Sequence, residues 1–126
     1  MKKIILVIVV TALIITAGVI EQVYVQRTFE ELEVKAENIY VMLRDKNYTD
    51  ALEYTANLKD WWYQKRDILE LVSPNNDIKE IVREIGELEG SQLAMMYDDS
   101  ITRSNVLQEM AKNSRNLLAY RWKNVF

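Results

Sequence analysis

The sequence contains neither cysteine nor histidine among its 126 residues. Without cysteine the chain forms no disulfide and has no thiol nucleophile. Without histidine it lacks the commonest general base and the commonest ligand for transition metals. Proline occurs once and glycine three times. With so few residues that end helices, the composition favours long helices over a turn-rich β fold.

The net charge is small, at −3, but the charges are unevenly distributed. Residues 21–99 hold nine basic and eighteen acidic side chains, a net charge of −9, whereas residues 100–126 hold five against one, a net charge of +4. We interpret this as a basic C-terminal helix packed beside an acidic layer. Contact of the basic end with anionic headgroups or an acidic partner is the alternative. We expect no nucleic-acid binding, because no basic patch is interleaved with stacking aromatics.

One long apolar run, Ile4–Ile20, carries no charge. At 1.5 Å per residue a helix of this length spans about 25 Å, close to the hydrocarbon thickness of a bilayer. We predict an uncleaved membrane anchor over residues 1–24. A cleaved signal peptide, with Lys2 and Lys3 before the run and Thr16–Gly18 as its cleavage site, is one alternative. A buried helix of a soluble protein is another.

The two lysines before the apolar run predict the orientation of the chain. Positive charge beside a membrane-spanning helix stays on the cytoplasmic side. We therefore expect a single-pass protein of the cell membrane, with a cytoplasmic N-terminus and an extracytoplasmic domain over residues 25–126.

Apolar side chains recur every three or four residues after the anchor, the spacing of amphipathic helices. They predict four helices, at about 25–46, 48–72, 77–96 and 100–123. Asn47, Pro74 and the Asp98–Asp99 pair mark the breaks, through turn formation and helix capping. Gly86 and Gly90 lie inside the third helix, where they allow either a close helix approach or a kink. The predicted fold is all-α: an N-terminal transmembrane helix followed by a four-helix bundle of two antiparallel hairpins.

A shift of 49 residues aligns the two halves of the domain. Tyr48 then falls over Tyr97, and Leu58 over Leu107. The start of the second helix, Asn47–Leu52, is similar to the repeat start of tetratricopeptide-type hairpins, although the full 34-residue pattern is absent. We expect the two hairpins to be alike and tetratricopeptide-like.

The run Trp61-Trp62-Tyr63 is the most conspicuous local feature. Adjacent helical residues point about 100° apart, so at least one ring should be partly exposed. The simpler interpretation is that two of the rings pack in the core. An aromatic docking patch is the functional one, because Trp and Tyr are common interface anchors. The candidate partner-binding residues are Trp61, Trp62, Tyr63, Trp122 and Phe126.

The whole chain resembles a family known only as a domain of unknown function. The likeness lies in the Met1-Lys2-Lys3 start, the aliphatic anchor ending near Glu21, the Asn47–Leu52 turn, the Trp61-Trp62 region and the closing Asn124–Phe126. Its members are short, singly anchored helical proteins of clostridia-like, spore-forming Gram-positive bacteria. The resemblance implies that the domain faces a cell-wall space or the gap between spore membranes, and it implies no catalytic residue.

No catalytic, cofactor-binding or metal-binding motif stands out, so we expect a protein without enzymatic activity and without a cofactor. The leading hypothesis is a membrane-anchored interaction or scaffold module, with an envelope protein or a second copy of the chain as partner. A bundle that senses a small ligand between its helices and signals through a partner membrane protein is the alternative. A carboxylate-based hydrolase is the third hypothesis.

Overall fold

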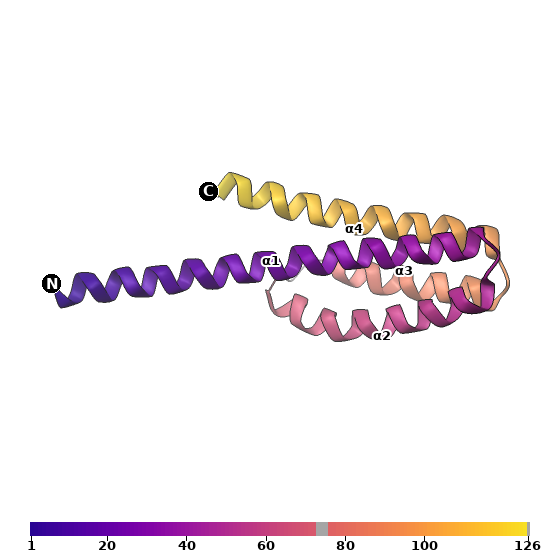
Figure 1. Ribbon diagram of the computed structural model, residues 1–126, viewed down its shortest axis with the longest axis horizontal. Coiled ribbons are helices and arrows are strands. Elements are labelled where there is room, and N and C mark those ends of the chain that lie inside the picture. Colours follow the sequence, from indigo (N-terminus) through magenta and orange to yellow (C-terminus); the bar gives the residue numbers. More distant parts are fainter. Residues whose placement is uncertain (73–75, 126) are drawn as a thin grey trace.

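The chain folds into four helices in the computed structural model (Figure 1), which describes residues 1–72 and 76–125. The side chains of residues 1–71 and 78–117 are described. The helices are α1 (Lys2–Arg44), α2 (Tyr48–Val72), α3 (Asn76–Leu93) and α4 (Tyr97–Val125). The all-α prediction is therefore confirmed over the described residues.

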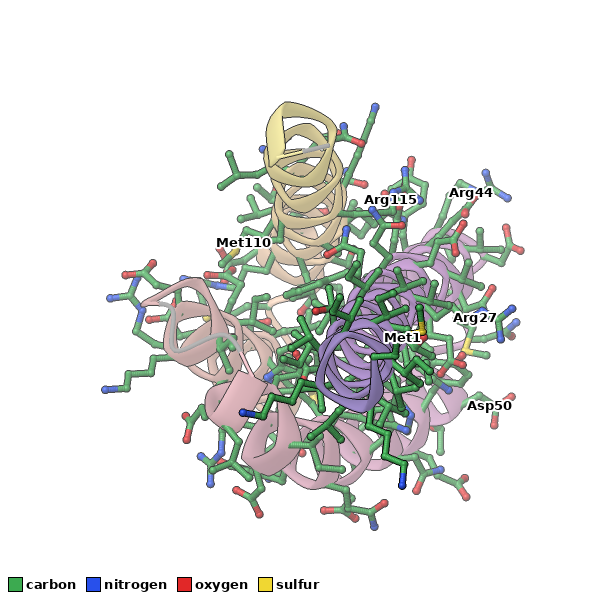
Figure 2. All side chains as sticks on the ribbon, turned by 90° about the vertical axis from the view of Figure 1, so that its left-hand side faces the viewer. Met1, Arg27, Arg44, Asp50, Met110 and Arg115 are labelled. Atoms are coloured by element: carbon green, nitrogen blue, oxygen red, sulfur yellow. The ribbon has the colours of Figure 1, made fainter. Side chains whose placement is uncertain are left out.

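The helices run alternately up and down, so that each lies antiparallel to its neighbours in sequence (Figure 1). α1 packs against α2 and α4, and α3 packs against the same two helices. Viewed along α1, the four helices surround one core (Figure 2). The α1–α2 and α3–α4 turns lie together at one end of this bundle, which we call the distal end. The end of α2 and the start of α3 lie at the opposite end of the bundle, nearer the N-terminus of the chain, which we call the proximal end.

α1 joins the apolar N-terminal run to the bundle without a break. Its 43 residues correspond to a length of about 65 Å. It is long and apolar enough to cross a membrane, and none of its most apolar 18-residue window is buried. A core helix of a soluble protein is covered by its neighbours, so this exposure contradicts the buried-helix alternative. Residues 24 and 25, the expected boundary of anchor and domain, lie within one continuous helix.

The bundle core follows a narrow stripe along α1, in which buried residues alternate at spacings of four and three. The stripe comprises Val25, Phe29, Leu32, Ala36, Ile39 and Leu43. Small buried side chains on α4 accompany it: Ser100, Ser104, Ala111 and Ser114. Small side chains let two helix backbones approach closely, and α1 and α4 have the most extensive backbone contact of the four helix pairs.

The two distal turns have the same backbone geometry at the 49-residue shift. Lys46 and Met95 both adopt a left-handed conformation, with φ of 65° and 59°. The amides of Asp45, Lys46 and Asn47 donate to the carbonyls of Val41, Leu43 and Met42, and those of Ala94, Met95 and Met96 donate to the carbonyls of Gly90, Gln92 and Ser91. Tyr48 stacks on Tyr97, with ring centroids 3.6 Å apart. The two halves of the bundle are thus alike at these turns, while a tetratricopeptide-like arrangement stays a prediction.

The second of these turns shifts two predicted helix boundaries. α3 ends at Leu93 rather than near Met96, because Met95 leaves the right-handed helical region. α4 begins at Tyr97 rather than Ser100. Asp98 and Asp99 therefore lie inside its first turn, where their charges favour the positive end of the helix dipole. The capping role predicted for this pair is wrong to that extent.

Gly86 and Gly90 lie on the outer surface of α3, which continues through both. A Cβ atom built on either residue meets no other atom within 4 Å. The close helix approach predicted as one alternative therefore does not account for them. We expect Gly86→Ala to stabilise the bundle by about 1 kcal/mol, because alanine loses less backbone entropy in a helix. Thermal unfolding in detergent, followed by circular dichroism, measures this gain, and an unchanged or lower melting temperature would contradict it.

Candidate functional site

The aromatic run on α2 divides between core and surface. Trp62 is only 1 % exposed and lies 5.9 Å from the ring of Phe29, measured between centroids. Trp61 is half-buried beneath the Lys35 ammonium, and Tyr63 is 39 % exposed beside the Arg66 guanidinium. Trp62 therefore serves the core, and only its two neighbours present surface to a partner. The side chains of Trp122 and Phe126 lie outside the described residues.

Ion pairs connect the helices around the bundle. Arg115 on α4 lies 2.9 Å from the Glu33 carboxylate on α1 (Figure 2 labels Arg115 between these helices). Arg103, also on α4, pairs with Glu84 and Glu87 on α3. The interpretation of the charge asymmetry as a basic helix beside acidic ones is confirmed for these two arginines.

Two cationic side chains of the bundle, Arg103 and Lys59, have raised pKa values. The pKa of Arg103 is raised, first by its hydrogen bond to the Asp99 carboxylate. The pKa of Lys59 on α2 is raised by its 2.8 Å hydrogen bond to Glu89 on α3 and by the charge of that carboxylate. Both side chains are therefore cationic at neutral pH and hold adjacent helices together. Neither has the lowered pKa that a general base needs.

The distal part of the core includes several polar side chains among its apolar ones. The hydroxyls of Ser91 and Ser100 lie 2.7 Å apart, and the Thr55 hydroxyl donates to the Ala51 carbonyl. Gln92, the residue after Ser91, is also buried, but the nitrogen and the oxygen of its side-chain amide have no hydrogen-bond partner among the described residues. A buried polar group without a partner costs free energy because it has given up its hydrogen bonds to water.

We expect Gln92→Leu to stabilise the bundle by about 1–2 kcal/mol, because the change removes two unpaired buried atoms. Leucine fits the repeat-equivalent position, where Leu43 is fully buried. The reciprocal variant Leu43→Gln is the matched control and should destabilise the bundle. The free energy of unfolding in denaturant measures both, and a loss of stability in Gln92→Leu would contradict the assignment of an unpaired amide.

The α3–α4 turn exposes an apolar surface at the distal end. Leu93, Met95 and Met96 are 64 %, 74 % and 56 % exposed. We call these three residues the distal tip. The helix predicted over residues 77–96 includes all three residues, so this exposed surface was not predicted. The 49-residue alignment contained a signal for it, since it places Met95 over Lys46, which adjoins the break predicted at Asn47.

Two open grooves flank α1 on the side of α2. The larger, of about 700 Å³, is lined by residues of both charges, among them Glu30, Glu31 and Lys35. The smaller, of about 390 Å³, lies at the proximal end and is lined by Val19, Ile20, Val23, Tyr24, Arg27, Thr28, Glu31 and Lys65. Within residues 1–71 and 78–117, no three acidic side chains converge in a group that could hold a metal ion.

No protein-family model, curated protein or solved structure matches this chain. The resemblance to short anchored proteins of spore-forming bacteria therefore stays a prediction.

Proposed function

We propose that this protein is a single-pass, membrane-anchored helical module that holds a protein-binding surface away from the membrane, without catalysis. The observation that carries the proposal is the continuity of α1, which runs from the exposed apolar segment to the distal end of the core. A helix that continues from anchor to core couples the orientation of the bundle to the membrane. Lys2 and Lys3 favour an extracytoplasmic bundle through the positive-inside rule.

The distal tip is the surface best placed for a partner. Ile20 and Leu43 are separated along α1 by about 35 Å, so the tip lies well beyond the headgroups of the membrane. Met95 has a left-handed backbone conformation, which costs a residue with a side chain about 1 kcal/mol and costs glycine nothing. A long apolar side chain nevertheless occupies this position. We propose an envelope protein as the partner, with a second copy of the chain as the other possibility to be tested.

The test is photo-crosslinking of the full-length protein in cell membranes. A photoreactive residue is placed at Met96 in the distal tip, at Tyr63 in the aromatic run, or at exposed Glu37 as the control. We expect one protein to be captured from Met96 and not from Glu37. Capture from Tyr63 alone would move the site to the aromatic run. If the only captured protein is a second copy of this chain, the partner is the chain itself and not an envelope protein.

Met95→Gly separates binding from folding. We expect this variant to gain about 1 kcal/mol in stability by relieving the left-handed methionine, yet to lose capture at Met96. Lys46→Gly is the matched control, because it makes the same backbone change in the other turn and leaves the apolar tip intact. Equal capture in the two variants would contradict the tip as the docking surface.

A further inference from the structure

The proximal groove combines an apolar wall with two cationic side chains. Val19, Ile20 and Val23 belong to, or directly follow, the apolar segment of α1. Arg27 on α1 and Lys65 on α2 line the same groove. Its volume of about 390 Å³ is within the range of about 300–1,000 Å³ that small-molecule sites occupy. An apolar wall that continues into a charged rim matches an amphiphilic ligand rather than a uniformly polar one.

The cations of the groove are available to an anion. Lys65 is half-buried, with its ammonium 3.4 Å from the Tyr24 hydroxyl and 5.2 Å from the centre of the Tyr24 ring. Arg27 is exposed and lies on the outer side of the bundle (Figure 2). Within the part of the chain whose side chains are described, neither cation forms an ion pair with a carboxylate. Among the residues whose side chains are described, Glu31 is the one acidic side chain that lines the groove.

The groove lies at the depth where lipid headgroups are expected. If Ile20 marks the end of the hydrocarbon, Arg27 is about 10 Å further along α1. Long cationic side chains near a membrane-spanning segment reach back to the headgroups, and tyrosine is favoured in the same layer. The last turns of α2, at the same end of the bundle (Figure 1), expose Ile68 and Leu71, and Leu71 is 86 % exposed. The proximal end therefore offers apolar and cationic groups together.

We propose that the proximal groove binds one anionic phospholipid of the adjoining leaflet. An acyl chain lies along Val19, Ile20 and Val23, and the phosphate lies between Arg27 and Lys65. This inference rests on the proposed membrane anchoring. The bound lipid fixes the bundle upright on the leaflet, because it contacts α1 and α2 at once.

The test is native mass spectrometry of the full-length protein released from detergent micelles, with phosphatidylglycerol added as the probe. We expect one retained lipid per chain, and about 25-fold weaker retention in Arg27→Gln/Lys65→Gln, since each cation near a lipid surface contributes about fivefold to binding. Arg44→Gln/Lys46→Gln removes the same charge at the distal end and should retain lipid like the parent protein. Arg27→Gln alone, at an exposed position, should weaken retention by about fivefold and preserves a test if the double variant misfolds.

Three outcomes would overturn the proposal: equal retention in the proximal and distal variants, equal loss in both, or displacement of the lipid by millimolar inorganic phosphate. The last would indicate a phosphate site without lipid recognition. Extraction of cell membranes with alkaline carbonate tests the anchoring separately. If the protein stays in the membrane but retains no lipid, only the lipid-binding proposal is contradicted. If carbonate removes the protein from the membrane, the proposed membrane-anchored function is contradicted as well.

Discussion

Trp62→Ala is expected to destabilise the bundle by about 4 kcal/mol, the largest effect of any single truncation considered for this core. Trp62 has the largest fully buried side chain described in the bundle, and its ring packs on Phe29 from the neighbouring helix. Its removal opens a cavity that the surrounding side chains fill only in part. A fall in the denaturation midpoint of the full-length protein in detergent, followed by circular dichroism, measures the loss.

Two variants make this result specific. Tyr63→Ala changes the exposed member of the run and should alter stability by no more than about 0.5 kcal/mol. Trp62→Phe retains an aromatic ring and removes the indole N–H, which is buried without a hydrogen-bond partner among the described residues. It should therefore cost much less than alanine. Similar losses in Trp62→Ala and Tyr63→Ala would show that the core is not arranged as described.

Val23→Pro is expected to uncouple the bundle from the anchor. Val23 lies in α1 between the apolar segment and the buried stripe, and its side chain is exposed. Proline there removes the hydrogen bond to the Val19 carbonyl and costs about 3 kcal/mol or more in a helix interior. Because the stripe begins at Val25, we expect the bundle to stay folded while the joint bends. Partner capture at the distal tip should fall, since the surface is no longer held at a fixed distance.

Spin labels can measure this bend directly, because the chain has no cysteine of its own. Labels at Ile15→Cys and Glu37→Cys span the joint, and a straight α1 places their backbone positions about 33 Å apart. Val23→Pro should shorten and broaden this distribution, and Val23→Ala should not. A second pair, Arg27→Cys and Arg44→Cys, lies beyond the joint at about 25 Å and should be unchanged. A broad distribution in the parent protein would contradict the rigid coupling.

Periodicity predicted the helices well because each carries its own apolar stripe. α2 has its predicted bounds, and the stripe from Val25 to Leu43 is the observed core face of α1. Periodicity could not predict the end of α3, because Met95 and Met96 continue the apolar spacing of the helix although the backbone has already left the helical conformation. Apolar periodicity cannot distinguish a buried methionine from one exposed at a turn.

The candidate sites were harder to predict, since they depend on contacts between distant residues. The indole of Trp62 is buried because Phe29 and the α1 stripe lie opposite it, which local spacing does not reveal. The proximal groove brings Arg27 within reach of the same ligand as Lys65 only when α1 and α2 pack together. By contrast, the 49-residue alignment of the sequence indicated that the two distal turns are alike, and their hydrogen bonds match at this shift. Such a likeness can be found in the sequence because a turn depends mainly on local backbone conformation.

The antiparallel packing of α1 has a mechanical consequence. A partner that pulls on the distal tip applies a load that returns to the membrane along α1, parallel to its contacts with α2 and α4. Such a load shears whole rows of side chains at once instead of peeling them apart one by one. The extensive packing of α1 against α4 then resists sliding together with the Arg115–Glu33 ion pair. The bundle should therefore bear tension along its axis far better than tension applied across it.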